Sequence, residues 1–231
     1  MYNEVSTRRD TLHELYIYGA ELEQQYGFPV LQPVYAEPTE SVSFREMQKV
    51  VDTKGKVVHF YIDDCWFEKL WTNADRYIEQ LRCFPCVIMP DFSVFDYMPW
   101  SMQLWNRYRS MALAYYMSQH GIKVIPSLGV LPNHIWTLVG LPQHSTVAVS
   151  TNGRIKKPKE RKQFVNELNR QIEIIKPKNL IMIGFVPEEW DEPVPTIYLE
   201  SESQKEYMRR LNKDDGMGGT RSIRIYKKTR G

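Results

Sequence analysis

Two acidic residues each follow a run of apolar, largely β-branched or aromatic residues. Asp63 comes after the run at 57–62, VVHFYI, and Asp91 comes soon after the run at 86–89, CVIM. Two carboxylates can hold Mg²⁺ or Mn²⁺ through oxygen, or can act as a general acid and base. The alternative is that these acids only cap the helices or turns that follow, as Asp often does. We take Asp63 and Asp91 as candidate catalytic residues and candidate metal ligands.

Hydroxyl side chains stand at the same relative position after two later apolar runs. Ser127 follows the run at 122–125, and Ser150 follows the run at 146–149. Ligands of parallel sheets bind beyond the carboxyl ends of the strands, where these side chains would lie. Ser127 and Ser150 are therefore candidate catalytic residues as well, and His134 is the one histidine expected near this rim.

Two other groups of polar residues are expected to be structural. Arg107 and Arg109 lie about eight to ten residues into a long predicted helix, which is roughly 12–15 Å from its start. They are therefore expected to form a structural ion pair away from the rim. The pair Cys83 and Cys86 ends a helix and begins a strand, whereas a redox CxxC pair begins a helix. We expect these thiols to be neither a redox pair nor a zinc site.

Basic residues gather at the C-terminal end of the chain. Nine Lys or Arg and three acids lie between residues 204 and 231, although the whole chain has a net charge of only +2. Such a tail can neutralise phosphates and stack a base on its tyrosine, but a solvated basic terminus with no partner is equally compatible. The predicted nucleic-acid-binding residues are Arg221, Arg224, Tyr226, Lys227 and Lys228.

The elements that must position these residues alternate between strands and helices. Five short apolar runs, with a sixth candidate at 196–199, are separated by stretches with helical spacing, including 67–81, 99–120 and 159–175. This alternation predicts an α/β fold with a mostly parallel sheet of five or six strands. The sheet is expected to be open, or an incomplete (β/α) barrel, because there are too few units for eight strands.

The chain divides into three predicted regions. Residues 1–55 form an entry region with a helix at 11–26 and extended segments, residues 56–202 form the α/β core, and residues 203–231 form the basic tail. No apolar run approaches the roughly 18 residues of a membrane span, and the first residues do not resemble a signal peptide. We therefore expect a cytoplasmic protein that does not enter a membrane.

Several motifs together resemble one known family. They are VHFYIDD at 58–64, MPDFS at 89–93, MPWSMQLWNRYR at 98–109, GIKVIPS at 121–127 and STNG at 150–153. The chain resembles, over about residues 55–185, phage and mobile-element proteins known as domain of unknown function 4417. The resemblance implies a phage or plasmid gene product in a bacterial cytoplasm and carries over no activity. It adds interest to the residues inside the motifs, namely Asp63, Asp91, Arg107, Ser127 and Ser150.

Three functions are compatible with the sequence. The first is a divalent-metal-dependent enzyme, using Mg²⁺ or Mn²⁺, that acts on nucleic acid or nucleotides. The second is a non-catalytic module that binds a host protein through exposed aromatic side chains, with no convergent polar pocket. The third is a small-ligand or sugar-binding barrel derivative in which Trp136 or Trp190 provides a stacking platform.

Overall fold

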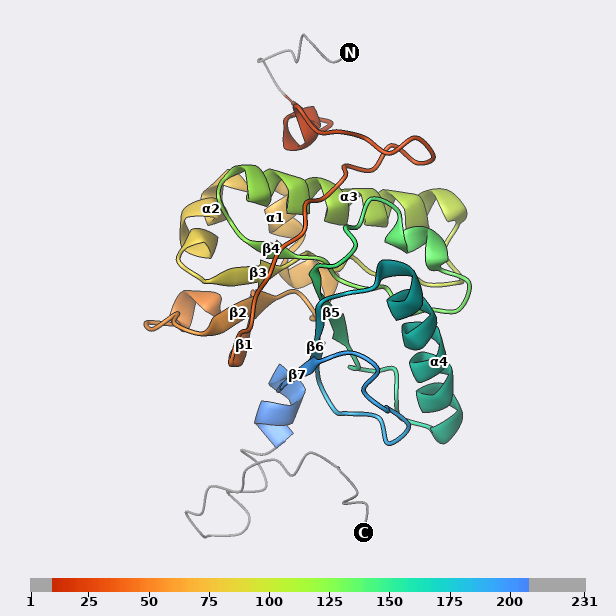
Figure 1. The fold of residues 1–231 in the computed structure, drawn as a ribbon. Coiled ribbons are helices and arrows are strands. Elements are labelled where there is room, and N and C mark those ends of the chain that lie inside the picture. Colours follow the sequence, from red (N-terminus) through yellow and green to blue (C-terminus); the bar gives the residue numbers. More distant parts are fainter. Residues whose placement is uncertain (1–9, 208–231) are drawn as a thin grey trace.

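A computed structural model describes residues 10–207, which form parallel strands flanked by helices (Figure 1). The strands are β1 (Glu40–Ser43), β2 (Lys56–His59), β3 (Cys86–Ile88), β4 (Val124–Ile125), β5 (Thr146–Ser150), β6 (Asn179–Ile183) and β7 (Thr196–Leu199). The α-helices are α1 (Glu68–Thr72), α2 (Asp75–Arg82), α3 (Trp100–Gln119) and α4 (Pro158–Ile175). Short 3-10 helices are η1 (Glu14–Ile17), η2 (Met47–Lys49), η3 (Asp64–Trp66) and η4 (Ile135–Leu138).

The strands pair in the order in which they occur along the chain. One sheet has the order β1-β2-β3-β4, the other has β5-β6-β7, and every pairing is parallel. A parallel bridge between Ser127 and Ala148 links the two sheets. Sequential order is typical of a (β/α) barrel, whereas a doubly wound sheet reverses its order at a switch point. The predicted α/β fold with an open, barrel-like parallel sheet is confirmed.

The segment after β7 lies against β1, at the other edge of the sheets. Ser41 Oγ donates a hydrogen bond to the carbonyl of Glu200, and Lys205 Nζ donates to the carbonyl of Ser41 over 2.6 Å. Residues 202–207 are helical. These contacts cover the edge of β1, which would otherwise present unpaired backbone groups.

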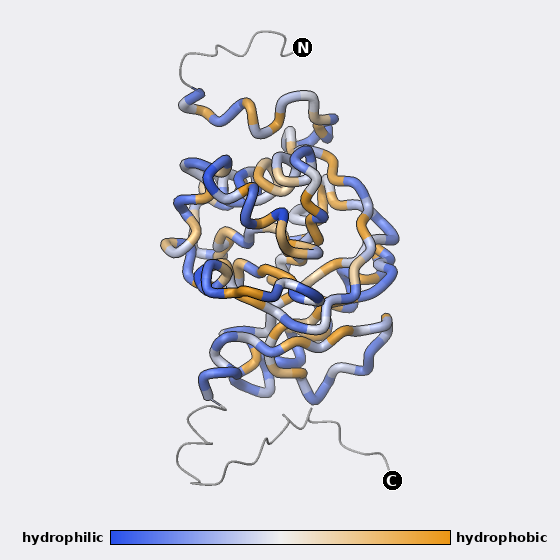
Figure 2. The backbone as a smooth tube through the Cα atoms, turned by 90° about the vertical axis from the view of Figure 1, so that its left-hand side faces the viewer, coloured by the Kyte–Doolittle hydropathy of each residue, from blue (hydrophilic) through white to orange (hydrophobic). Residues whose placement is uncertain are grey.

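The two faces of the strands belong to two separate cores. One face packs against the helices and forms the larger core, which includes Val58, Val87 and Leu180. The other face forms a smaller cluster whose buried members all come from strands: Val57, Cys86, Ile88, Ile125, Ala148, Ile181, Ile183 and Leu199. A cluster without helix residues is what the inside of a barrel contains. Figure 2 shows hydrophobic segments of the backbone in the middle of the molecule.

The sheet begins earlier, and the N-terminal helix is shorter, than the sequence indicated. β1 belongs to the predicted entry region, yet it pairs with β2 over its full length. The predicted helix at 11–26 is wrong, because only η1 forms and Gly19 has a positive φ of 75°. This segment instead packs over α3 (Figure 1).

The single helix expected at 67–81 is interrupted at Asn73, where φ is −156° and ψ is 81°. The hydroxyl of Tyr16 donates to the carbonyl of Trp71 over 3.1 Å and accepts from the amide of Ala74 over 3.0 Å. A side chain from the N-terminal segment thus pairs the backbone groups at the break between α1 and α2.

Proline residues end the strands that lead to the candidate site. Pro90 follows β3 and Pro126 follows β4, and neither has an amide proton for the ladder. Residues 89–99, the β3–α3 loop, then lead to α3, which begins after Pro99 and ends before Gly121, as predicted. None of the helices between residues 10 and 207 is long and apolar enough to cross a membrane.

Candidate functional site

A cavity of about 60 Å³ lies beyond the carboxyl ends of β3 and β4. The β3–α3 loop, the middle of α3 and the segments after β4 and β5 enclose it. Its lining residues are Asp91, Phe92, Ser93, Val94, Phe95, Arg107, Ser110, Gly129, Leu131, His134, Thr137 and Arg154. One water needs about 10–15 Å³ by this measure, so the cavity has room for roughly four to six waters. That space suits one small polar or charged group.

Asp91 stands at the end of a chain of hydrogen-bonded hydroxyls. The hydroxyls of Tyr61 and Ser127 lie 2.9 Å apart, and Ser127 Oγ donates to Asp91 Oδ1 over 3.3 Å. Because Ser127 donates to the carboxylate, Tyr61 is placed to donate to Ser127. Burial raises the pKa of the Asp91 carboxyl above its ordinary value, although the charges of Arg154 and Arg107 oppose that shift. A carboxyl with a raised pKa at a strand end is suited to general acid–base chemistry.

Arg107 is a buried cation that lines the same cavity. Its side chain comes from the middle of α3, and the residue is only 4% exposed. Two of its guanidinium nitrogens, Nε and Nη2, are buried without a hydrogen-bond partner in the described structure. Burial lowers the pKa of Arg107 to about 10, while the charge of Asp91 acts in the opposite direction. Arg107 therefore retains its positive charge at neutral pH and places a buried cation at the wall of the cavity.

Arg154 brings a second guanidinium from the segment after β5. It is half-buried, and its Nη1 donates to the carbonyl of Val130 over 2.8 Å. Its positive charge lowers the pKa of Asp91, whereas the negative charge of Asp64 raises it. Two cations from different elements thus converge on the wall that carries Asp91.

His134 closes another side of the cavity. Its Nδ1 lies 2.6 Å from the carbonyl of Pro132, and its Nε2 lies 3.1 Å from Gln103 Oε1 and 3.5 Å from Asp96 Oδ1. Both ring nitrogens face oxygen atoms, and a neutral ring donates from one of them. The sequence prediction that His134 lies near the rim is confirmed.

The β3–α3 loop is held in place by polar side chains. Asp64 accepts hydrogen bonds from the amide and the hydroxyl of Ser93, each over 3.0 Å. Asn106 Nδ2 donates to the carbonyl of Ser93. Three hydrogen bonds therefore fix Ser93 between η3 and α3, which gives the cavity a defined wall.

The two arginines expected to be structural have different roles. Arg109 Nη1 lies 2.7 Å from Glu68 Oε1 and its guanidinium lies 3.8 Å over the ring of Phe92, so the predicted structural ion pair is confirmed. The same prediction was wrong for Arg107, which lines the cavity. The position of a residue along a helix gives its distance from the rim only if the helix starts at the rim. The β3–α3 loop displaces the start of α3, so that its middle passes the cavity.

The structure brings together some of the predicted catalytic residues. Asp91 and Ser127 are in contact, whereas Asp63 is exposed and does not line the cavity. Ser150 does not line it either, and its hydroxyl accepts a hydrogen bond from the amide of Asn152 over 3.2 Å. Within residues 10–207, no group of three or more His, Cys, Asp or Glu is arranged to hold a metal ion. The predicted nucleic-acid-binding residues of the tail, 221–228, lie outside the described residues.

Sequence reasoning missed Tyr61, Arg154 and the role of Asp64. A signal for Tyr61 was present, since it stands four residues after Val57 on a β-strand pattern and therefore shares its inward face. Arg154 follows the STNG motif directly after β5, at the rim where ligands bind. Nothing in the sequence distinguishes the role of Asp64 from that of its neighbour Asp63. It is the turn into η3 that directs the Asp64 carboxylate to Ser93.

Comparisons with known proteins agree with the phage resemblance. The family described as "Domain of unknown function (DUF4417)" matches residues 20–200. The "Gene 1 protein" of Mycobacterium phage L5 is 29% identical over 168 residues, which cover 71% of this chain and 73% of the phage protein. The "Gene 1 protein" of Mycobacterium phage D29 is 26% identical over 163 residues, covering 69% of this chain but only 60% of that protein. No solved structure matches significantly. The family match spans most of the chain, and the chain therefore belongs to the DUF4417 family, a domain of unknown function with relatives in phages.

Proposed function

We propose that this protein is an enzyme that binds a phosphate group of a nucleotide or nucleic-acid substrate at Arg107 and Arg154, with Asp91 transferring a proton. The observation that carries the proposal is the buried guanidinium of Arg107, which has two unpaired nitrogens and lines a cavity of about 60 Å³.

The unpaired donors of Arg107 favour an anionic ligand. A buried donor without a partner costs about 1–3 kcal/mol, and a charged one costs more. A phosphate would supply acceptors to Arg107, and the planar guanidinium suits phosphate and carboxylate geometry. Arg154 adds a second positive charge at the same wall. The free protein thus keeps an unfavourable arrangement that a bound anion relieves.

Proton uptake by Asp91 would accompany anion binding. Arg107 and Arg154 carry two positive charges, and Asp91 and Asp64 balance them when both acids are ionised. A bound anion disfavours the ionised carboxylate and so raises the pKa of Asp91 further. By linkage, binding takes up protons, and affinity for the anion decreases as the pH rises through that pKa. An Asp91 protonated in this way is in the state that a general acid requires.

A divalent metal at Asp63 and Asp91 stays a prediction from the sequence. Two guanidinium groups near Asp91 repel a cation, and Asp63 is exposed without lining the cavity. The charge at the cavity therefore favours an anion over Mg²⁺ or Mn²⁺. Saturable binding of Mg²⁺ that is lost in both Asp63→Ala and Asp91→Ala would restore the metal-dependent mechanism.

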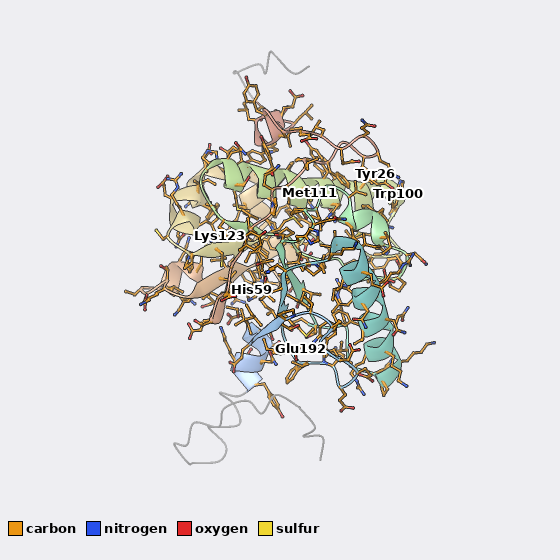
Figure 3. The ribbon with its side chains drawn as sticks, viewed as in Figure 1. Tyr26, His59, Trp100, Met111, Lys123 and Glu192 are labelled. Carbon is orange, nitrogen blue, oxygen red and sulfur yellow. The ribbon has the colours of Figure 1, made fainter. Side chains whose placement is uncertain are left out.

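A second candidate function, binding of a host protein, is favoured by exposed apolar side chains at the start of α3. Trp100, Met102 and Trp105 are each between 45% and 49% exposed. Figure 3 shows Trp100 beside Tyr26, on the part of the molecule where the N-terminal segment passes α3. This function requires an apolar surface and does not explain the unpaired nitrogens of Arg107.

Sulfate binding measured by calorimetry tests the proposal, because sulfate keeps its charge across the pH range in which Asp91 titrates. We expect saturable binding by the wild-type protein, at least a tenfold loss in Arg107→Met, and no change in Arg76→Met. Arg76 is an exposed arginine on α2 and serves as the matched control. Titrations in buffers with different ionisation enthalpies should show proton uptake, and Asp91→Asn should remove it.

Two results would contradict the proposal. The first is the absence of saturable sulfate binding by a folded wild-type protein. The second is binding that Arg107→Met and Arg76→Met reduce equally, since that would be a general effect of surface charge.

A further inference from the structure

We infer that the substrate at this site presents an unpaired nucleobase, stacked on an aromatic platform formed by Phe95 and Tyr97. This inference rests on the proposed binding of a phosphate group and narrows the substrate to a mononucleotide or a single-stranded end. It is carried by the position, exposure and mutual geometry of these two side chains in the β3–α3 loop.

The two rings form an exposed stack at the edge of the cavity. Their centroids are 5.3 Å apart and their planes differ by 10°. Phe95 lines the cavity and is 40% exposed, and Tyr97 is 81% exposed. Single exposed aromatics are common on protein surfaces, but here two parallel rings adjoin a cavity that is lined by two arginines, Arg107 and Arg154. A flat ring of the ligand can extend this stack while its charged group occupies the cavity.

The platform belongs to a loop that is fixed on both sides of it. Ser93 is held by Asp64 and Asn106, as described above. Met98 is held twice, since Gln103 Nε2 donates to its carbonyl over 2.8 Å and its amide donates to the carbonyl of Phe95 over 3.0 Å. A ligand that stacks on this loop therefore does not have to order it first, which lowers the cost of binding.

The size of the cavity determines which part of the ligand, the phosphate or the nucleobase, lies inside it. About 60 Å³ accommodates a phosphate-sized group and excludes a nucleobase. The base must then lie outside, where Phe95 and Tyr97 are exposed. Inside a duplex each base is covered by its neighbours, so only an unpaired base offers a free face to aromatic side chains. This combination of phosphate cavity and aromatic platform selects an unpaired nucleotide over a double helix.

The experiment compares adenosine monophosphate with ribose phosphate by calorimetry. Stacking one base on an aromatic side chain corresponds to about a 5- to 150-fold gain in affinity. We expect adenosine monophosphate to bind more tightly than ribose phosphate by a factor in that range, and Tyr97→Ala and Phe95→Ala to reduce this advantage. Binding of ribose phosphate should be unchanged in Tyr97→Ala.

Tyr35→Ala is the matched control for a lost exposed tyrosine. Tyr35 is 59% exposed. The amide of the next residue, Ala36, donates a hydrogen bond to Thr146 Oγ1 at the start of β5, which places Tyr35 at the end of the strands opposite the cavity. This variant should bind both ligands like the wild-type protein. A phosphorylated single strand should likewise compete with adenosine monophosphate, and the matching blunt duplex should not.

The outcomes distinguish this inference from the proposed function. If both ligands bind with equal affinity and depend on Arg107, the phosphate site stands and the base platform is refuted. The same holds if Tyr97→Ala and Tyr35→Ala weaken nucleotide binding equally, or if the duplex competes as well as the single strand. If neither ligand binds, the proposed function itself fails.

Discussion

Two arginines that lie two residues apart on α3 show how local environment sets the role of a residue. Arg109 has an ion pair with Glu68, a hydrogen bond to Asn106 and the ring of Phe92 beneath it. Arg107 is similarly buried, but two of its nitrogens, Nε and Nη2, are unpaired, whereas in Arg109 only Nε is. The contacts of Arg109 stabilise the fold, whereas the guanidinium of Arg107 can still pair with a ligand. Unpaired donors thus mark a candidate site residue where the side chain also lines a cavity, which Arg107 does and Arg109 does not.

The two arginines should differ in their contribution to stability. Replacing Arg109 with Met removes several partnered contacts and should lower the free energy of unfolding by about 1–3 kcal/mol. Replacing Arg107 with Met removes a desolvated cation with two unpaired nitrogens, while Asp91 keeps Arg154 and Ser127 nearby. That variant should be as stable as the wild-type protein, or more stable by up to about 2 kcal/mol.

Urea unfolding of the two variants at neutral pH measures this difference. An equal loss of stability in Arg107→Met and Arg109→Met would show that Arg107 is also a structural residue. The stability measurement is independent of any ligand, so it complements the sulfate titration.

Among the elements, the strand ends are where the backbone is most constrained. Gly184 directly follows β6 with a φ of 118°, and its amide donates to the carbonyl of Leu199. A Cβ at this position would lie 2.3 Å from Thr151 Oγ1. Thr151 is buried, so it cannot easily move away. The absence of a side chain at Gly184 therefore lets the segments after β5 and β6 approach each other at the rim.

Gly184→Ala should be more destabilising than Gly153→Ala. Both glycines have positive φ, but nothing lies within 4 Å of a Cβ at Gly153. Gly153→Ala should lower the free energy of unfolding by about 1–2 kcal/mol through backbone strain alone. Gly184→Ala adds a steric clash and should cost about 1–3 kcal/mol more, as measured by thermal or urea unfolding. Equal effects would mean that Thr151 relaxes without cost.

Over the whole molecule, the last described residues lie at the end of the sheet that carries the cavity. The carboxyl ends of parallel strands lie together, and the helical residues 202–207 follow β7 at that end and contact β1. The chain therefore leaves the described structure from the same end of the strands that carries the cavity.

Replacing Arg221, Arg224, Lys227 and Lys228 with Ala tests the role of the tail. If these residues neutralise phosphates, binding of single-stranded DNA should weaken, and the slope of log affinity against log salt should decrease in magnitude by about 3. The melting temperature and the binding of adenosine monophosphate should be unchanged, because the described lining of the cavity comes from residues 91–154. An unchanged salt slope would identify a solvated terminus without a nucleic-acid partner.

The sequence by itself determined strands β2 to β7 and the rim, but not β1. Apolar runs of β-branched residues can form only buried strands here, and the prolines after β3 and β4 end two of them at fixed positions. Asp91 and Ser127 follow these stops closely, so their presence at the rim was predictable.

The tertiary structure decided which side chains converge. The β3–α3 loop sets where α3 passes the rim, which directs Arg107 inward, and the turn into η3 directs Asp64 to Ser93 while Asp63 stays exposed. The contribution of Tyr16 to the break in the helix at Asn73 likewise depends on residues nearly sixty positions apart. Local spacing fixes the position of a residue along its element. Loop length and packing between distant segments fix its direction, because they depend on contacts that no local pattern contains.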